Sequence, residues 1–192
     1  MLMKDWKKEL LTIPNLLSLF RLVLIPVYVV IYVHANSGKE YFLAAAILGV
    51  SCLTDLVDGK IARHFNMVST VGKILDPLAD KATQFTLILC LALKYKVLWY
   101  LIVLFVIKES FQLVAGGLTL RRGVMLKGAL LTGKICTAVL FISLIIMVMI
   151  PSLPHKTVNI IAITDSIFMI ISFADYLRAY FGNTNHFQSL NG

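Results

Sequence analysis

The chain is 192 residues long, 59% of its residues are hydrophobic, only 15% are charged, and its mean hydropathy is +0.86. A soluble domain has about half apolar and about a quarter charged residues, so this composition excludes an ordinary soluble protein and predicts an all-α integral membrane protein. The formal net charge of +8 would suit a nucleic-acid partner, but the placement of the basic residues argues against one.

The first element is predicted to be an amphipathic helix over residues 1–12 that lies at the membrane surface. Apolar residues recur there every four positions with lysines between them. The pattern consists of Leu2, Trp6 and Leu10 together with Lys4, Lys7 and Lys8. Such a basic and apolar helix is typical of an anionic lipid surface. The apolar run that follows is too long for a signal peptide, so we expect it to be retained.

Six apolar stretches follow, each close to the roughly 20 residues that a membrane-spanning helix needs. We predict spanning helices over 13–34, 40–62, 70–94, 97–120, 128–150 and 156–180. The connections are short, and no internal repeat is evident. The chain is therefore predicted to contain one six-helix transmembrane domain over 13–182 and a polar tail over 183–192.

The basic residues predict how these helices are oriented. With a cytoplasmic N-terminus, eleven Lys and Arg residues fall on the cytoplasmic side and four on the other. Cytoplasmic loops of membrane proteins carry such an excess. We therefore expect a multi-pass protein of a bacterial cytoplasmic membrane with both termini in the cytoplasm. This topology explains the positive charge without nucleic acid.

Four of the ten acidic residues lie where the second predicted span ends and the third begins, at Asp55, Asp58, Asp76 and Asp80. Spacings of three and four residues place the members of each pair on one helix face, and antiparallel neighbouring spans can bring the pairs together. Carboxylates at membrane depth are costly unless compensated. Together with substrate phosphates they suit Mg²⁺ or Mn²⁺. Four carboxylates are more than one ion usually takes, so we predict a two-metal site facing the cytoplasm.

Small and basic residues stand beside these acids. Gly59, Ala62 and Gly72 would let a flat or phosphorylated group approach the backbone closely. Arg63 can bind a phosphate group through two hydrogen bonds. This combination favours a site for a phosphorylated ligand at the ends of the two helices.

An alternative explanation is that the acids form salt bridges that pack the helices together. The basic neighbours available for this are Lys60, Arg63, Lys73 and Lys81. Arg21 and Lys81 lie deeper in their spans and are candidates to balance the carboxylates. The two explanations predict the same helices but different chemistry.

The pattern Asp-x-x-Asp-Gly-x-x-Ala-Arg, followed after eight residues by Gly-x-x-x-Asp-x-x-x-Asp, resembles the signature of the CDP-alcohol phosphatidyltransferase family at every defined position. The likeness covers the whole chain and includes Ile13-Pro14-Asn15 and Arg21 in the first span. The chain is most similar to the phosphatidylglycerophosphate synthase branch of the family, and also resembles CDP-alcohol-type cardiolipin synthases.

The resemblance implies a metal-dependent enzyme of phospholipid biosynthesis that works as a homodimer. It would transfer the phosphatidyl group from CDP-diacylglycerol to an alcohol, with glycerol 3-phosphate as the favoured acceptor, and release CMP. By the same resemblance the four aspartates hold the metal ions, and Asp80 is also the base that takes the proton of the attacking hydroxyl. The residues implied to bind CDP-diacylglycerol are Asp58, Gly59, Ala62, Arg63 and Gly72.

A phosphorylated acceptor needs cations beyond the carboxylates. Lys134, Arg178 and Arg121 are the candidates, although ordinary positive-inside charge is the better explanation for any single one of them. In the fourth span the resembling synthases have Arg-Glu, where this chain has Lys108-Glu109. Because lysine lacks the two-pronged geometry of arginine, phosphatidylglycerol, inositol phosphate and serine stay open as acceptors.

Two further classes compete with this interpretation. A membrane prenyltransferase also binds a diphosphate through aspartate-rich motifs, but the glycine, alanine and arginine positions do not fit one. A cation transporter would carry its acids near the bilayer midplane, often within a repeated half. Here the acids gather at one end of two helices, which favours the enzyme.

Overall fold

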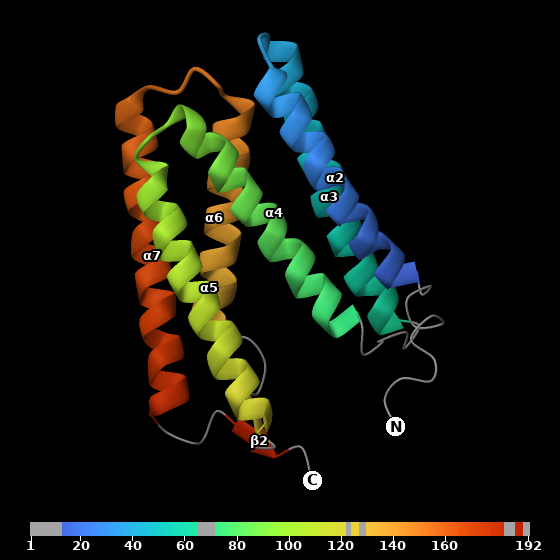
Figure 1. Ribbon diagram of the computed structural model, residues 1–192, viewed down its shortest axis with the longest axis vertical. Coiled ribbons are helices and arrows are strands. Elements are labelled where there is room, and N and C mark those ends of the chain that lie inside the picture. Colours follow the sequence, from blue (N-terminus) through green and yellow to red (C-terminus); the bar gives the residue numbers. More distant parts are fainter. Residues whose placement is uncertain (1–12, 65–71, 122–123, 127–129, 183–186, 190–192) are drawn as a thin grey trace. The chain divides into compact units, whose positions relative to one another are not determined.

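The computed structural model describes residues 13–64, 72–121, 124–126, 130–182 and 187–189 (Figure 1). This part of the chain is helical apart from two three-residue strands. The helices are α2 (Ile13–His34), α3 (Gly38–His64), α4 (Gly72–Lys94), α5 (Leu98–Arg121), α6 (Leu131–Met149) and α7 (His155–Phe181), and the strands are β1 (Val124–Leu126) and β2 (Phe187–Ser189).

The six helices agree closely with the six predicted spans. The largest difference is at α6, which begins at Leu131 where the sequence predicted residue 128. Within the described residues, α2, α5, α6 and α7 are long and apolar enough to cross a membrane. The protein is therefore a multi-pass membrane protein. The predicted surface helix over 1–12 lies outside the described residues.

The chain divides into two compact units. The first comprises residues 1–90 and 148–151, and so contains α2, α3 and most of α4. The second comprises residues 91–147 and 152–192, with α5, α7, both strands and most of α6. The division falls inside α4, between Cys90 and Leu91.

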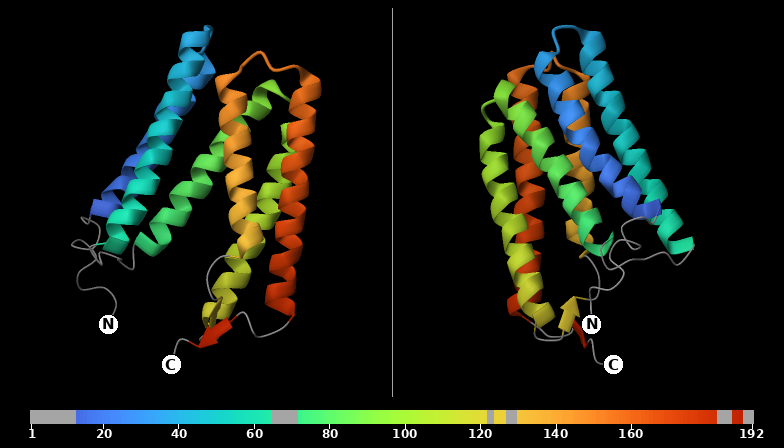
Figure 2. Two further views of the ribbon diagram at one scale, coloured as in Figure 1. Left: turned by 180° about the vertical axis from the view of Figure 1, so that it is seen from behind. Right: turned by 45° about the vertical axis from the view of Figure 1, so that its right-hand side comes forward.

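In the first unit, α2 and α3 form an antiparallel hairpin and lie side by side (Figures 1 and 2). Its turn is held by Glu40, the glutamate half of a capping box, whose carboxylate accepts hydrogen bonds from the backbone N–H groups of Ser37 at 3.0 Å and Asn36 at 2.5 Å. Next to the turn, the Tyr32 ring lies 5.6 Å from the ring of Tyr41 on α3. These contacts set the register of the hairpin.

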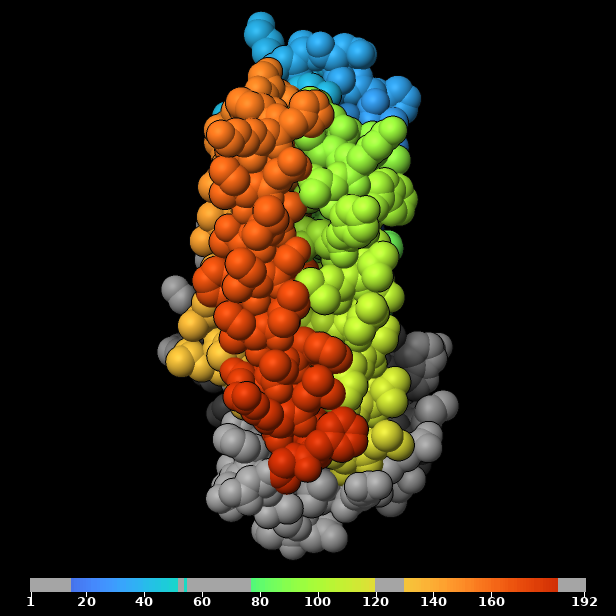
Figure 3. Space-filling model, turned by 90° about the vertical axis from the view of Figure 1, so that its left-hand side faces the viewer, coloured from blue at the N-terminus to red at the C-terminus, as the bar shows by residue number. Residues whose placement is uncertain are grey.

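In the second unit, α5 and α7 pack side by side, as Figure 3 shows from the outside. Phe111 of α5 meets the rings of Phe173 at 5.3 Å and Tyr180 at 5.9 Å, both edge to face, which is a favourable aromatic geometry. Toward the start of α7, the Tyr95 hydroxyl donates to the Leu153 carbonyl at 3.4 Å. Aromatic contacts around Phe111 thus join α5 to the second half of α7, and a hydrogen bond joins the segments that precede the two helices.

The outer face of α7 is strongly apolar. Its isoleucines are about half exposed, whereas a second face of the same helix is buried and includes polar groups. The exposed isoleucines are Ile160, Ile163, Ile167, Ile170 and Ile171. An apolar face turned outward is what a helix in contact with lipid requires.

Strand β2 pairs antiparallel with β1, with Val124 opposite Ser189 and Leu126 opposite Phe187. The sequence analysis predicted no strand and assigned residues 183–192 to a polar tail. A three-residue strand is too short to display the alternation by which strands are recognised. The pair ties residues 187–189 back to the end of α5 in the second unit.

Candidate active site

The two halves of the aspartate motif occupy the ends of two helices of the first unit. Asp55 to Arg63 lies in the last turns of α3, and Gly72 to Asp80 lies in the first turns of α4. Figures 1 and 2 show these two helix ends at the same end of the unit. The helical backbone keeps each aspartate pair at the one-face spacing that the sequence predicted.

Of the four motif aspartates, Asp80 alone has a described side chain. The side chains of Asp55, Asp58 and Asp76 lie outside the described part, as do those of Gly59 to Arg63. Among the described side chains, no group of three or more His, Cys, Asp or Glu residues is placed to hold a metal ion. The predicted convergence of the carboxylates therefore stays a prediction.

Asp80 is held by an arginine from another helix. The Nη1 atom of Arg21 on α2 donates to the Oδ1 atom of Asp80 on α4, and the two side chains form an ion pair. The arginine side chain is 2% exposed, while the aspartate side chain is 42% exposed. The prediction that Arg21 balances one of the carboxylates is confirmed.

Arg21 belongs to a polar face of α2. Asn15, Ser18 and Arg21 follow one another at three-residue spacing, and each is at most 2% exposed. Residues three apart share a helix face, so α2 presents polar groups to the interior of the first unit. The sequence analysis did not single out Ser18. The signal available in the sequence was the helical spacing of these polar residues inside an apolar span.

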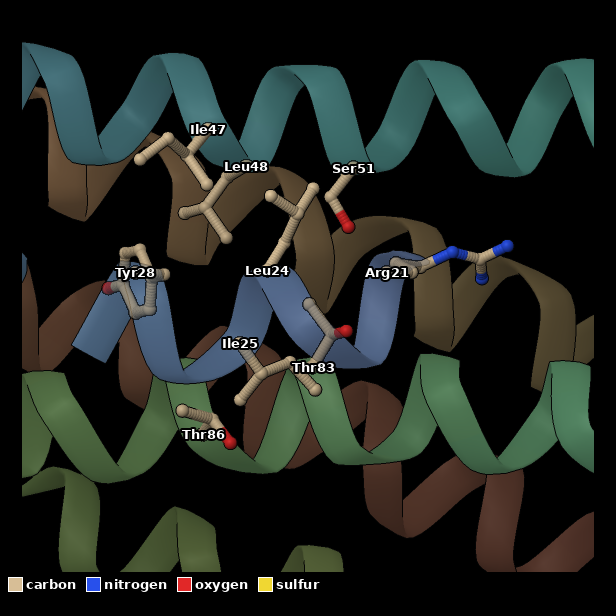
Figure 4. A pocket seen from close by; sticks show the side chains of 9 residues that line it. All are labelled: Arg21, Leu24, Ile25, Tyr28, Ile47, Leu48, Ser51, Thr83 and Thr86. Atoms are coloured by element: carbon tan, nitrogen blue, oxygen red, sulfur yellow. The ribbon is translucent and has the colours of Figure 1, made fainter. Parts of the chain in front are cut away.

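A small cavity separates Arg21 from the turn end of the hairpin (Figure 4). It offers only about 10 Å³ to the centre of a water molecule, enough for about one water and too little for a substrate. Its walls come from Leu24, Ile25 and Tyr28 of α2, Ile47, Leu48 and Ser51 of α3, and Thr83 and Thr86 of α4. Figure 4 shows the Arg21 guanidinium pointing along α2, away from Tyr28.

The predicted acceptor residues lie in the second unit. Arg178, in the last turn of α7, lines an open groove of about 510 Å³ between the start of α6 and the end of α7, and its Nη1 lies 3.9 Å from Asp175 Oδ1. Lys134 is exposed in the first turn of α6 but does not line this groove. Arg121 ends α5, and its side chain lies outside the described part.

Lys108 lies inside the second unit and not at a surface. It is 3% exposed, and its Nζ donates to Glu109 Oε1 at 2.7 Å and to Gln112 Oε1 at 3.3 Å. The Lys108-Glu109 pair is thus part of a polar cluster on α5. This geometry favours a helix-stabilising role for the pair.

The sequence analysis missed Asp165. This residue is 2% exposed on α7, and its Oδ1 accepts a hydrogen bond at 2.9 Å from the hydroxyl of Ser143 on α6. A lone carboxylate in an apolar span is a signal by itself, because such groups are costly and rarely placed without a partner. The partner, however, is an ordinary serine on another helix.

The model of the family described as CDP-alcohol phosphatidyltransferase matches residues 11–174, so the chain belongs to this family. A putative cardiolipin synthase of Mycobacterium tuberculosis is 37% identical over 135 residues, which is 68% of this chain and 61% of the relative. A probable phosphatidylglycerophosphate synthase of the same organism is 28% identical over 174 residues, covering 89% of this chain and 82% of the relative. The match thus spans about three fifths of the length of the cardiolipin synthase relative.

Proposed function

We propose that this protein transfers the phosphatidyl group of CDP-diacylglycerol to an alcohol and releases CMP. The observation that carries the proposal is the complete aspartate motif on α3 and α4 of a chain that belongs to the CDP-alcohol phosphatidyltransferase family. The partly exposed Asp80 carboxylate supports it further. A purely structural salt bridge would have no need of an open carboxylate.

In the proposed reaction the acceptor hydroxyl oxygen attacks the phosphorus atom that carries the diacylglycerol. The new P–O bond forms, the P–O bond to the CMP phosphate breaks, and CMP leaves with the electron pair of that bond. Asp80 takes the hydroxyl proton as general base. Asp58, Gly59, Ala62, Arg63 and Gly72 are proposed to bind the cytidine diphosphate head group.

The donor set fits Mg²⁺ or Mn²⁺. We propose that Asp55, Asp58, Asp76 and Asp80 hold two such ions, because hard divalent cations prefer carboxylate oxygens and the motif contributes no soft ligand. Bound ions would neutralise the diphosphate and the charge that develops on the leaving group. The exposure of Asp80 on α4 is consistent with access to a ligand.

The proposed membrane arrangement has six spanning helices, α2 to α7, and a surface helix over 1–12. The motif would then face the cytoplasm, where the excess of Lys and Arg lies. A donor with two acyl chains places its reacting phosphorus at headgroup depth, which the ends of spanning helices reach. We also propose a homodimer, as the family resemblance implies.

Glycerol 3-phosphate is the acceptor we propose first. A relative that shares 82% of its length with this chain is named a probable phosphatidylglycerophosphate synthase. We propose that Arg178, which lines the groove between α6 and α7, binds the acceptor phosphate, and that Lys134 and Arg121 contribute positive charge outside that groove. Charge-assisted hydrogen bonds to phosphate favour arginine at such a place.

Phosphatidylglycerol is the second candidate acceptor, and the product would then be cardiolipin. It is favoured by the higher identity to the relative named putative cardiolipin synthase, 37% against 28%. The two acceptors differ in an obvious way, since one is a water-soluble phosphate monoester and the other a lipid.

A panel of acceptors with purified protein, CDP-diacylglycerol and Mg²⁺ tests both parts of the proposal. We expect CMP release with glycerol 3-phosphate, loss of release with EDTA, and a Michaelis constant for the acceptor about tenfold higher in Arg178→Ala. CMP release with phosphatidylglycerol but with no other acceptor would change the proposed acceptor and leave the proposed reaction unchanged. No CMP with any acceptor in the panel, serine and inositol phosphate included, would overturn the reaction itself.

A further inference from the structure

We propose that Arg21 is a positioning residue for the reaction. Its buried guanidinium holds Oδ1 of Asp80 and thereby orients the partly exposed carboxylate toward the acceptor hydroxyl. The inference rests on the proposed function, because it assigns Arg21 a role through the proposed base. It adds a residue from the first helix to a site otherwise built from α3 and α4.

Only one partner of the ion pair, the arginine, is buried. The Arg21 side chain is 2% exposed, while that of Asp80 is 42% exposed. A pair that served packing alone would be expected to bury both partners or to expose both. Here the cation is buried in the protein interior and the carboxylate is partly exposed. This is the arrangement expected of a positioning residue and the group that it positions.

The surroundings of Arg21 limit its movement on the side toward Tyr28. Its neighbours on the inner side are apolar or weakly polar residues of three helices, and the cavity beside it is too small for the guanidinium to turn into. Figure 4 shows the Arg21 side chain extended along α2. An arginine side chain has many rotamers, so packing that selects one of them lets the ion pair form with little further loss of entropy.

The backbone that carries Asp80 is held as well. Its neighbour Ala79 is 0% exposed, and the hydroxyl of Thr83 donates to the Ala79 carbonyl at 2.8 Å. Ala79 is therefore packed next to the aspartate, and Arg21 fixes the orientation of the Asp80 side chain. Partners that orient a catalytic or metal-binding group commonly contribute about 10- to 100-fold to activity.

The pair also addresses the double demand on Asp80 as proposed ligand and proposed base. A carboxylate has two oxygens, and a single mobile carboxylate would present either of them in any orientation. With Oδ1 tied to Arg21, the orientation of the whole group is set from α2. The predicted consequence is that Arg21 affects the rate of the chemical step and not the binding of the donor.

The test compares Arg21→Gln, Arg21→Lys and Asp80→Asn with the double variants, in full-length protein purified in detergent. We expect Arg21→Gln to lower kcat about 10- to 100-fold with an unchanged KM for CDP-diacylglycerol. Arg21→Lys, which keeps the cation, should restore part of the loss. In the Asp80→Asn background neither change of Arg21 should lower the residual kcat further, because the residue through which Arg21 acts is already lost.

Tyr28→Phe is the matched control, since Tyr28 is also on α2, is 2% exposed and lines the same cavity. It should leave kcat unchanged. If Arg21→Gln does not fold, Arg21→Lys decides: a loss of kcat in the presence of Asp80 but not of Asn at that position supports the inference. An unchanged kcat in the Arg21 variants, or an equal loss of kcat with Asp80 and with Asn at position 80, overturns the inference. The proposed function would still stand in that case, because the wild type releases CMP. Absence of CMP release from the wild type would overturn both.

Discussion

The two units bury polar groups in different ways. In the first unit a buried arginine on α2 holds an aspartate on α4 whose side chain is 42% exposed. In the second unit the side chains of Lys108 and Glu109 are only 4% and 13% exposed, and Asp165 is 2% exposed against Ser143. The ion pair of the first unit therefore has one partly exposed partner, which we call an open pair. The polar clusters of the second unit are buried, and we call them closed.

This difference indicates where chemistry can take place. Burying a charge costs free energy in either unit, and a paired geometry offsets only part of that cost. A closed cluster contributes to the packing and register of the helices. An open carboxylate held by a buried cation can also meet a ligand. We therefore expect substitution of the Arg21–Asp80 pair in the first unit to affect the reaction, and substitution within the buried clusters of the second unit to affect stability.

Asp80→Asn should have the largest effect. The asparagine carbonyl can still accept the hydrogen bond from Arg21, so the fold should survive, but the amide cannot take a proton. We expect kcat to fall about 10²- to 10⁴-fold, with donor binding largely retained. CMP release and binding of CDP-diacylglycerol measure the two quantities.

The matched control for this prediction is Asp165→Asn, the same chemical change in the second unit. It should leave kcat close to that of the wild type, because Asp165 contacts Ser143 and the asparagine oxygen can accept the same hydrogen bond. A wild-type rate in Asp80→Asn would remove Asp80 as the base and would erase the contrast between the units.

Glu109→Leu should destabilise the second unit strongly. It would leave the Lys108 ammonium group buried without the carboxylate that lies 2.7 Å away, and breaking a buried pair in this way costs about 3–5 kcal/mol. The thermal midpoint of the protein in detergent measures the loss. The double variant Lys108→Met/Glu109→Leu should recover most of it, because no charge is left unpaired. Equal midpoints for wild type and Glu109→Leu would contradict a closed cluster.

Gly133→Ala tests the close approach of α6 to α7. A Cβ atom at Gly133 would lie 2.8 Å from the hydroxyl and 2.9 Å from a ring carbon of Tyr176, so the ring must shift. Overpacking of this kind costs about 1–3 kcal/mol. The same substitution at Gly117, where nothing lies within 4 Å, is the control and should leave the midpoint unchanged or raise it, because alanine favours a helix more than glycine does. Similar midpoints for the two variants would argue against tight packing at Gly133.

Ser143→Ala should have the smallest effect. It removes the hydrogen bond between α6 and α7, and such bonds within membranes average about 0.6 kcal/mol. Ser166→Ala is a suitable comparison, since the Ser166 hydroxyl donates only within its own helix, to the Ala162 carbonyl at 2.7 Å. A stability loss at Ser143 no greater than at Ser166 would show that Asp165 contributes nothing through this contact.

Much of the fold could be predicted because its signals are local. The ends of α2 at Ile13 and His34 coincide with the predicted span, since hydropathy alone marks where an apolar run begins and stops. The strands could not be predicted, because three residues carry too little pattern. Asp165 was visible as a lone acid in an apolar span, but its partner Ser143 has no distinguishing feature in the sequence.

The amino-acid sequence by itself determined the membrane class, the helix positions and the spacing of the motif aspartates along α3 and α4, since these depend on composition and on contacts within one or two helical turns. Only the tertiary structure decided that Arg21 is the cation paired with Asp80, 59 residues away. It also decided that Lys108 lies buried beside Glu109 and Gln112. Burial and pairing between helices depend on how helix faces meet, and a sequence pattern along one helix does not contain that information.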